Sequence, residues 1–177
     1  NPLIRSQMLC PIELQAQEYF LSRFNTYIIV ATMKTTKVLQ TNVSQTNIDE
    51  VSNILNSSSG NKIAICNANT LVRSARDSDL ADLINDFTIK TPDGFPVAKA
   101  LSILTKQNFL RVDGYKVFLQ TIENGLDKNR SHYFFGSDEL TTKLMIKNLK
   151  KLYPEIQING YICPEIMEFD QLAEKYI

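Results

Sequence analysis

Short apolar segments alternate with amphipathic segments along this chain, and that alternation is the feature that most limits how it can fold. Apolar runs typical of strands stand at 26–31, 62–66, 87–90, 132–135 and 156–160. Helical patterns lie before, between and after them, at 11–24, 46–55, 69–86, 95–106, 113–126, 138–152 and from about 165. Strands separated by helices imply right-handed crossovers and a mainly parallel sheet. We therefore expect an α/β fold with helices on both faces of the sheet.

The composition excludes several classes of protein. The 177 residues are 44% hydrophobic and 21% charged, which suits one domain with a substantial core. Basic and acidic residues number 19 each, so no overall charge attracts nucleic acid, and we expect no such partner. Three separated cysteines and one histidine suit a reducing compartment and offer little for a zinc site. The longest apolar run, at 27–31, is far shorter than the roughly 20 residues that span a bilayer, so we expect a cytoplasmic protein.

Three predicted strands are followed closely by residues suited to binding. Asn67 comes after the strand at 62–66, Asp93 and Gly94 come after the strand at 87–90, and Gly136 comes after the strand at 132–135. Ligands of open α/β sheets bind beyond the carboxyl ends of the strands. The free N–H groups of the helix after Gly136 can also receive a phosphate. Taken singly, each position has a structural alternative, because Asn67 can cap a helix and an Asp-Gly pair can form a turn.

The order of these residues is more specific than any one of them. The chain carries, in sequence, Asn67, Asp93–Gly94, Arg111 with Gly114, Gly136, Tyr153–Pro154 and Gly160. From about residue 36 onward it resembles the WecG/TagA/CpsF family of bacterial glycosyltransferases. Members of that family carry an Asn after an early strand, an Asp-Gly after the next, an Arg-x-x-Gly, a strand ending in Gly, and a Tyr-Pro before another strand. The expected sheet is therefore Rossmann-like.

The resemblance implies a reaction and roles for these residues. The family transfers an N-acetylmannosamine-type sugar from a UDP donor to a lipid-linked polyprenyl pyrophosphate saccharide in cell-envelope polysaccharide synthesis. Transfer proceeds with inversion and without an essential metal, and no cofactor is expected. By this resemblance Asp93 is the general base, Asn67 hydrogen-bonds polar groups of a substrate, and Arg111 offsets pyrophosphate charge. Gly94 and Gly136 complete the implied substrate-binding set.

Two departures from the family pattern affect the expected organisation. Ile65 stands where the family often has threonine, and no Pro-x-Gln-Glu motif follows Gly160. We expect residues 1–32 to be an N-terminal extension and residues 33–177 to be a glycosyltransferase-like domain that lacks the family's C-terminal part. A second interpretation stays open, namely a non-catalytic nucleotide- or partner-binding α/β module. Peripheral contact with the inner face of the cell membrane and a homo-oligomer are also left open.

Other patterns have simpler explanations. The Asp-x-Asp at 77–79 matches a metal-binding motif of other glycosyltransferases, but it lies in a helical connection, where Ser78 or Asp79 is expected to cap a helix. We expect His132 to be a structural strand residue and Cys66 a small buried one. Four lysines on the predicted helix at 138–152 can meet anionic lipid, although a solvated face explains them as well: Lys143, Lys147, Lys150 and Lys151.

Overall fold

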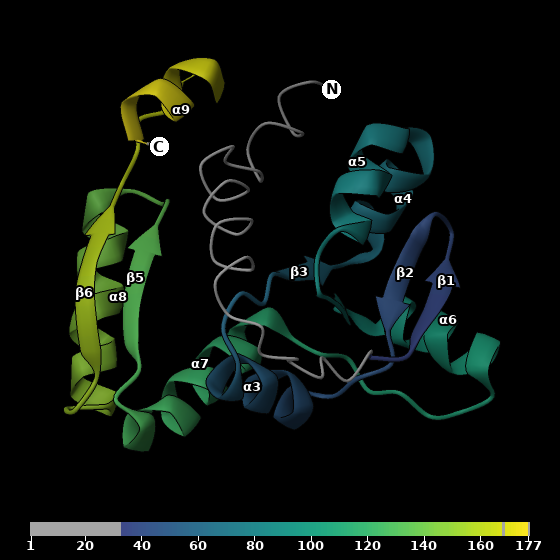
Figure 1. Cartoon of the computed structure of the whole chain (residues 1–177), viewed down its shortest axis with the longest axis horizontal. Helices are drawn as coiled ribbons and strands as arrows, with labels where there is room; N and C mark the ends of the chain where they lie inside the picture. The colour runs from purple at the N-terminus through teal and green to yellow at the C-terminus, as the bar shows by residue number, and fades with distance from the viewer. Residues whose placement is uncertain (1–32, 168, 177) are drawn as a thin grey trace, which may run out of the picture.

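The computed structural model describes residues 33–167 and 169–176, and it has the α/β fold expected from the sequence (Figure 1). The strands are β1 (Thr35–Val38), β2 (Thr41–Ser44), β3 (Ile63–Cys66), β4 (Ile89–Pro92), β5 (Ser131–Phe135) and β6 (Gln157–Ile162). The helices are α3 (Ile48–Ser57), α4 (Ala68–Arg76), α5 (Ser78–Asn85), α6 (Phe95–Thr105), α7 (Gly114–Gly125), the short 3-10 helix η1 (Leu126–Lys128), α8 (Glu139–Leu152) and α9 (Phe169–Tyr176). The predicted helix at 11–24 and strand at 26–31 lie outside the described residues.

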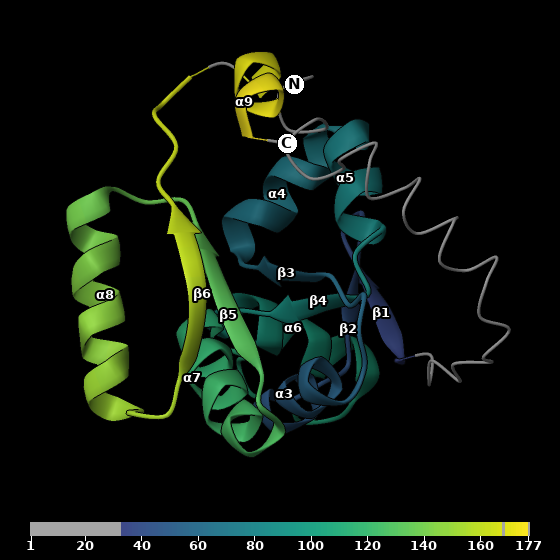
Figure 2. The ribbon, with the colours of Figure 1, turned by 60° about the vertical axis from the view of Figure 1, so that its left-hand side comes forward.

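The described strands form three pairs rather than one continuous sheet (Figure 2). β1 and β2 make an antiparallel hairpin, whereas β3 pairs with β4 and β5 with β6 in parallel. Both parallel pairs are connected through helices, α4 and α5 in the first and α8 in the second. The hairpin lies beside β4, where the Lys90 backbone N–H donates to the Ser44 hydroxyl at 3.0 Å. The small sheets are consistent with a Rossmann-like arrangement of strands and crossover helices.

Helices cover both faces of the β3–β4 pair. Successive side chains of a strand point to opposite faces. Cys66 therefore packs into a cluster with residues of the hairpin, α4, α5 and α6: Val38, Val43, Leu71, Leu80, Leu83, Ile84, Val97 and Leu101. Ile63 and Ile89 join a second cluster, in which Val51 of α3 and Val117 of α7 are buried. These two apolar layers hold the strands whose ends carry Asn67 and Asp93.

A third cluster lies under the β5–β6 pair. Its buried residues, Ile122, Leu149 and Ile156, come from α7, from α8 and from the residue before β6. The rings of Phe118 and Phe134 meet there with centroids 6.0 Å apart. Because α7 contributes to this cluster and to the one beside β4, it is the element that packs against both parallel pairs.

The structure corrects one omission of the sequence analysis. The β1–β2 hairpin was not predicted, because its two-residue turn, Leu39–Gln40, contains none of the Gly, Asn or Asp residues that usually mark such turns. Leu39 nevertheless has a φ of 55°. The backbone of a leucine residue rarely adopts this left-handed conformation. The hairpin is therefore maintained by packing rather than by local turn preference.

A second correction moves the strand that leads to Asp93. The strand predicted at 87–90 is β4, at Ile89–Pro92, and Pro92 pairs in register with Cys66. Proline lacks an N–H for the ladder and usually marks the end of a strand in a sequence, which explains the misplaced boundary. Asp93 therefore follows the strand directly.

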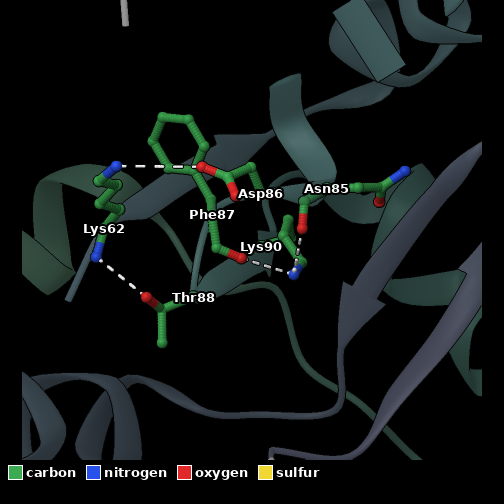
Figure 3. Close-up of polar contacts among 6 residues, drawn as sticks. All are labelled: Lys62, Asn85, Asp86, Phe87, Thr88 and Lys90. Atoms are coloured by element: carbon green, nitrogen blue, oxygen red, sulfur yellow. Dashed lines mark hydrogen bonds and ion pairs between the residues drawn. The ribbon is translucent and has the colours of Figure 1, made fainter. Parts of the chain in front are cut away.

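Lys90 anchors β4 to the end of α5 (Figure 3). Its ammonium group donates to the backbone carbonyls of Phe87, at 2.6 Å, and Asn85, at 3.4 Å. Asn85 is the last residue of α5, so the cation also meets the negative end of the helix dipole. Burial lowers the pKa of Lys90. Nearby, the backbone N–H of Lys62 donates to the Thr88 hydroxyl at 3.2 Å and joins the start of β3 to the start of β4.

Candidate functional site

Asn67 and Asp93 lie at the same end of the β3–β4 pair. They directly follow Cys66 and Pro92, which are partners in the parallel register. The Asp93 N–H donates to the Cys66 carbonyl at 3.1 Å, so the pairing continues one residue beyond β4. The carboxyl end of this strand pair therefore carries an amide side chain and a carboxylate, in the position where open α/β sheets bind ligands.

The Asp93 carboxylate is partly exposed and has no hydrogen bond or ion pair with the other described residues. Its backbone is held on both sides. The pairing with Cys66 fixes the approach, and Gly94 turns the chain into α6 with φ 80° and ψ 152°. That conformation belongs almost exclusively to glycine. A rigid backbone thus presents a carboxylate that is free to interact with a ligand.

Asn67 has a structural role that leaves half of its amide group available. Its side-chain oxygen accepts from the Thr70 N–H at 3.0 Å and from the Thr70 hydroxyl at 3.2 Å, which makes it the N-cap of α4. The side-chain NH₂ group has no partner among the described residues. Capping therefore orients the side chain while its donor end remains able to meet a ligand.

The segment with Arg111 runs beside the same strand end. The Val112 N–H donates to the Pro92 carbonyl at 2.9 Å. Arg111 Nη2 lies 3.2 Å from Asp113 Oδ2, and the other carboxylate oxygen of Asp113 caps α7. Gly114 approaches β3 so closely that an added Cβ would lie 3.2 Å from Ile65 Cγ2. These contacts set the exposed guanidinium group at the edge of the site.

Gly136 belongs to the other parallel pair. It follows β5, and its N–H donates to the Ile162 carbonyl at 2.9 Å. The Asp138 carboxylate accepts from the Thr141 N–H at 2.8 Å and hydroxyl at 2.6 Å, and these hydrogen bonds lower the pKa of Asp138. The N-terminus of α8 is thus already capped by an anion, which opposes a phosphate there. No hydrogen bond among the described residues links Gly136 to Asn67 or Asp93, so its role at the site stays a prediction.

Cys66 is a buried thiol at the base of the site. It is fully buried, as the sequence analysis expected, and burial raises its pKa to about 12. The Lys90 cation counteracts this shift and the Asp93 carboxylate adds to it. A thiol of this kind stays protonated at neutral pH and is therefore a packing residue rather than a nucleophile.

A pocket adjoins the strand ends, and the sequence analysis missed it. It has a volume of about 570 Å³ and lies between the start of α3, one face of α6 and the loop before α7. Arg111 lines it, whereas Asp93 and Asn67 do not. A sequence signal for this surface lies in the predicted helix at 95–106, where Phe95, Lys99 and Ile103 are spaced four residues apart and so share one side of the helix. All three side chains are exposed in the structure.

The alternative motifs are explained by local structure. Asp77, rather than Ser78 or Asp79, caps α5, since its side chain accepts from the Leu80 N–H at 3.0 Å. Within residues 33–167 and 169–176, no group of three or more His, Cys, Asp or Glu is placed to hold a metal ion. Lys143 pairs with Glu139 at 2.7 Å on an exposed face of α8. None of the helices in the described ranges is long and apolar enough to cross a membrane.

His132 and α3 complete the comparison with the sequence. His132 lies on β5, where burial lowers its pKa, and its Nε2 atom has no partner in the described part of the chain. Asn47 is the N-cap of α3, and its side chain accepts from the Glu50 N–H at 2.9 Å. The hydroxyl of Thr46, the residue before this cap, donates to the Glu50 carboxylate at 2.8 Å.

The carboxyl end of the β3–β4 pair thus carries a carboxylate and an amide, with a guanidinium group at its edge. Open α/β proteins as a class bind their ligands at this end of the sheet. The chain belongs to the WecG/TagA/CpsF glycosyl transferase family, whose model matches residues 36–177. The family resemblance drawn from the ordered motifs is therefore confirmed.

One curated relative matches part of the chain. A stretch of 84 residues is 25% identical to an N-acetylglucosaminyldiphosphoundecaprenol N-acetyl-beta-D-mannosaminyltransferase of Bacillus spizizenii. The match covers 48% of this chain and 33% of that relative. This chain therefore spans about a third of the length of the relative it matches.

Proposed function

We propose that this protein is an inverting glycosyltransferase of bacterial cell-envelope polysaccharide synthesis. It moves an N-acetylmannosamine-type sugar from a UDP donor to a lipid-linked polyprenyl diphosphate saccharide, at the inner face of the cell membrane. The name of the Bacillus spizizenii relative supports the acceptor class and the sugar, and the family supports the transferase class.

The observation that carries the proposal is the state of Asp93. This carboxylate is partly exposed, has no partner among the described residues and stands on a rigid strand end. A carboxylate that serves only to shape a turn normally hydrogen-bonds the backbone N–H groups that follow it, as Asp113 and Asp138 do here. Asp93 makes no such bond, which supports a role toward a substrate.

In the proposed reaction, an acceptor hydroxyl attacks the anomeric carbon of the donor sugar from the face opposite UDP. A new carbon–oxygen bond forms as the bond to UDP breaks, and UDP leaves with the bonding electrons. The hydroxyl proton passes to Asp93. A carboxylate is a weak base, so the proton moves late, when the attacking hydroxyl has become acidic. The rigid position of Asp93 contributes by holding the base in line.

The other site residues bind rather than react. The free NH₂ group of Asn67 donates to a sugar or phosphate oxygen next to Asp93. Arg111 offsets diphosphate charge, for which its planar fork of donors is suited. Gly94 keeps the Asp93 loop in its conformation, and Gly136 is proposed as a contact for the donor.

The test is Asp93→Asn in the full chain. This change keeps the size of the side chain but removes its ability to accept a proton, so sugar transfer is expected to fall roughly 10²–10⁴-fold. UDP affinity is expected to change little. Transfer is measured as UDP release with a UDP-N-acetylmannosamine donor and a polyprenyl diphosphate N-acetylglucosamine acceptor, and binding is measured by calorimetry.

Asp127→Asn is the matched control, because Asp127 is an exposed acid on η1, in another part of the fold. It is expected to leave transfer and UDP binding unchanged. Near-normal turnover by Asp93→Asn would reduce Asp93 to a loop residue. UDP binding by the wild-type chain with no transfer to any acceptor would favour the non-catalytic binding module instead.

A further inference from the structure

The pocket beside the Asp93 loop combines apolar walls with positive charge. Its volume of about 570 Å³ is typical of small-molecule sites, which measure about 300–1,000 Å³. Its apolar lining comes from α3, α6 and the loop before α7: Ile48, Phe95, Ala98, Phe109, Leu110 and Val112. The cations Lys99, Arg111 and Lys116 also line it.

Two of the apolar side chains are unusually exposed. Phe95 is 74% exposed and Leu110 is 78% exposed, although both line the same pocket. Ile103, on the same side of α6 as Phe95, is 66% exposed. Large apolar groups gathered in water around a pocket are typical of a surface that binds an apolar ligand.

The charges of the pocket favour an anion. Its one acidic side chain, Asp49, already accepts a hydrogen bond from the Gln120 side chain. Lys99 and Lys116 form no ion pair with the other described residues, and Arg111 shares one contact with Asp113. With three cations and one carboxylate, the pocket has a net positive charge, which complements a ligand with about two negative charges.

The pocket begins where the Asp93 loop ends. Phe95 is the second residue after Asp93, and Val112 is hydrogen-bonded to Pro92. Asp93 does not line the pocket. The pocket is therefore a neighbour of the Asp93 carboxylate and does not enclose it.

We propose that this pocket binds the isoprenyl diphosphate end of the lipid-linked acceptor, an inference that rests on the acceptor class of the proposed function. Isoprenyl units lie against Phe95 and Leu110, and the diphosphate lies against Lys99 and Lys116, whereas Arg111 at the edge of the site offsets the charge of the UDP donor. In a lipid-linked saccharide the sugar ring separates the diphosphate from the attacking hydroxyl. The diphosphate pocket is thus expected next to Asp93 and not around it, as observed. A nucleoside diphosphate without an isoprenyl chain has no apolar group to pack against Phe95 and Leu110.

The probe is farnesyl diphosphate, a short isoprenyl diphosphate, titrated into the full chain in a calorimeter. The pocket variant Leu110→Ser/Lys99→Gln changes two exposed side chains of the pocket. The affinity of this variant for farnesyl diphosphate is expected to be at least about tenfold lower than that of the wild type, because one apolar and one charged contact are lost together. Inorganic pyrophosphate is expected to bind the wild type at least about tenfold more weakly than farnesyl diphosphate does, because it lacks the apolar chain.

The matched control is Leu104→Ser/Lys147→Gln. Leu104 is 57% exposed on α6 and Lys147 is exposed on α8, and neither lines the pocket. The control is expected to bind farnesyl diphosphate like the wild type, and circular dichroism is expected to report the same fold for both variants. Phosphatidylglycerol vesicles without diphosphate lipid are expected to bind wild type and pocket variant equally.

Three results would overturn this assignment. The first is that the pocket variant binds farnesyl diphosphate as tightly as the wild type does. The second is that the wild type binds pyrophosphate as tightly as farnesyl diphosphate. The third is that the pocket variant loses binding to vesicles but keeps binding to farnesyl diphosphate. The transfer assay separates the two proposals. If Asp93→Asn stops transfer while the pocket variant keeps the wild-type acceptor KM, the pocket assignment fails and the transferase stands. If farnesyl diphosphate binding depends on the pocket but no transfer occurs, the transferase fails and the ligand class stands.

Discussion

At the scale of single residues, neighbouring side chains at one strand end have opposite environments. Cys66 is fully buried and its thiol is held neutral, whereas the carboxylate of Asp93 is partly exposed and has no partner in the described part of the chain. Lys90 is buried two residues before Pro92, and its charge is stabilised by two backbone carbonyls. Groups that stabilise the fold are thus satisfied internally, while Asp93, the proposed reacting group, remains free for a ligand.

The buried thiol predicts a pH dependence of stability. The pKa of Cys66 rises from its ordinary value of 9.0 to about 12 on folding. Its contribution to stability is therefore fully present below pH 9 and is lost as the pH rises toward 12, by up to roughly 1.4 kcal/mol per pH unit. Cys66→Ala removes this titration, so its unfolding free energy is expected to fall less steeply over that range. Urea denaturation at about pH 8 and about pH 10.5 measures the difference. Parallel slopes for the two proteins would contradict this account.

At the scale of elements, the connection from β4 to α6 determines where the carboxylate lies. β4 continues through Thr91 and Pro92, and Asp93 then meets Gly94, the N-cap of α6. The Val112 N–H closes the other side by bonding to the Pro92 carbonyl. Strand, turn and neighbouring loop together leave the Asp93 backbone little freedom.

Gly94→Ala tests this connection. Alanine at φ 80° and ψ 152° is strained by about 1–3 kcal/mol, so the loop is expected to shift and sugar transfer to fall at least about tenfold. Gly60→Ala is the matched control, because Gly60 also has a positive φ, 77°, with open space around it, in the loop before β3. Both variants are expected to lose stability in urea denaturation, but only Gly94→Ala is expected to lose transfer. Equal activities of the two variants would mean that this turn does not position the base.

At the scale of the whole molecule, the fold gathers positive charge on a chain whose net charge is zero. The formal charges balance, yet Lys99, Arg111 and Lys116 line one pocket beside the strand ends. Each comes from a different element, namely α6, the following loop and α7. Packing of α6 and α7 on the β3–β4 pair therefore creates the local potential that a diphosphate requires.

UDP is accordingly expected to bind without a divalent metal. Calorimetry in EDTA is expected to give the same affinity as calorimetry with magnesium or manganese, because Arg111 supplies positive charge at the strand ends. Arg111→Gln is expected to weaken UDP binding about tenfold. Arg73→Gln, on the exposed face of α4, is expected to have no effect. Binding that appears only with metal would return attention to the Asp-x-Asp at 77–79.

The predictable part of the fold and site is the part with strong local signals. The helices at 95–105, 114–125 and 139–152 agree with their apolar periodicity to within two residues. Asn67, Asp93 and Arg111 were selected by motif order, and the structure gives each a defined place around one strand pair. The hairpin was not predicted because Leu39 is not a residue typical of tight turns. The end of β4 was misplaced because a proline such as Pro92 usually indicates the end of a strand.

The sequence by itself determined the alternation of strands and helices after residue 46, the family, and the polar residues that follow the strands, because these follow from short-range periodicity and motif order. Only the tertiary structure decided that the described strands form three separate pairs, that the Asp93 carboxylate has no partner among the described residues, and that Leu110 and Lys99 share a pocket. Those properties depend on contacts between residues far apart in the chain. Packing free energy summed over the whole fold selects such contacts, and no local pattern encodes them.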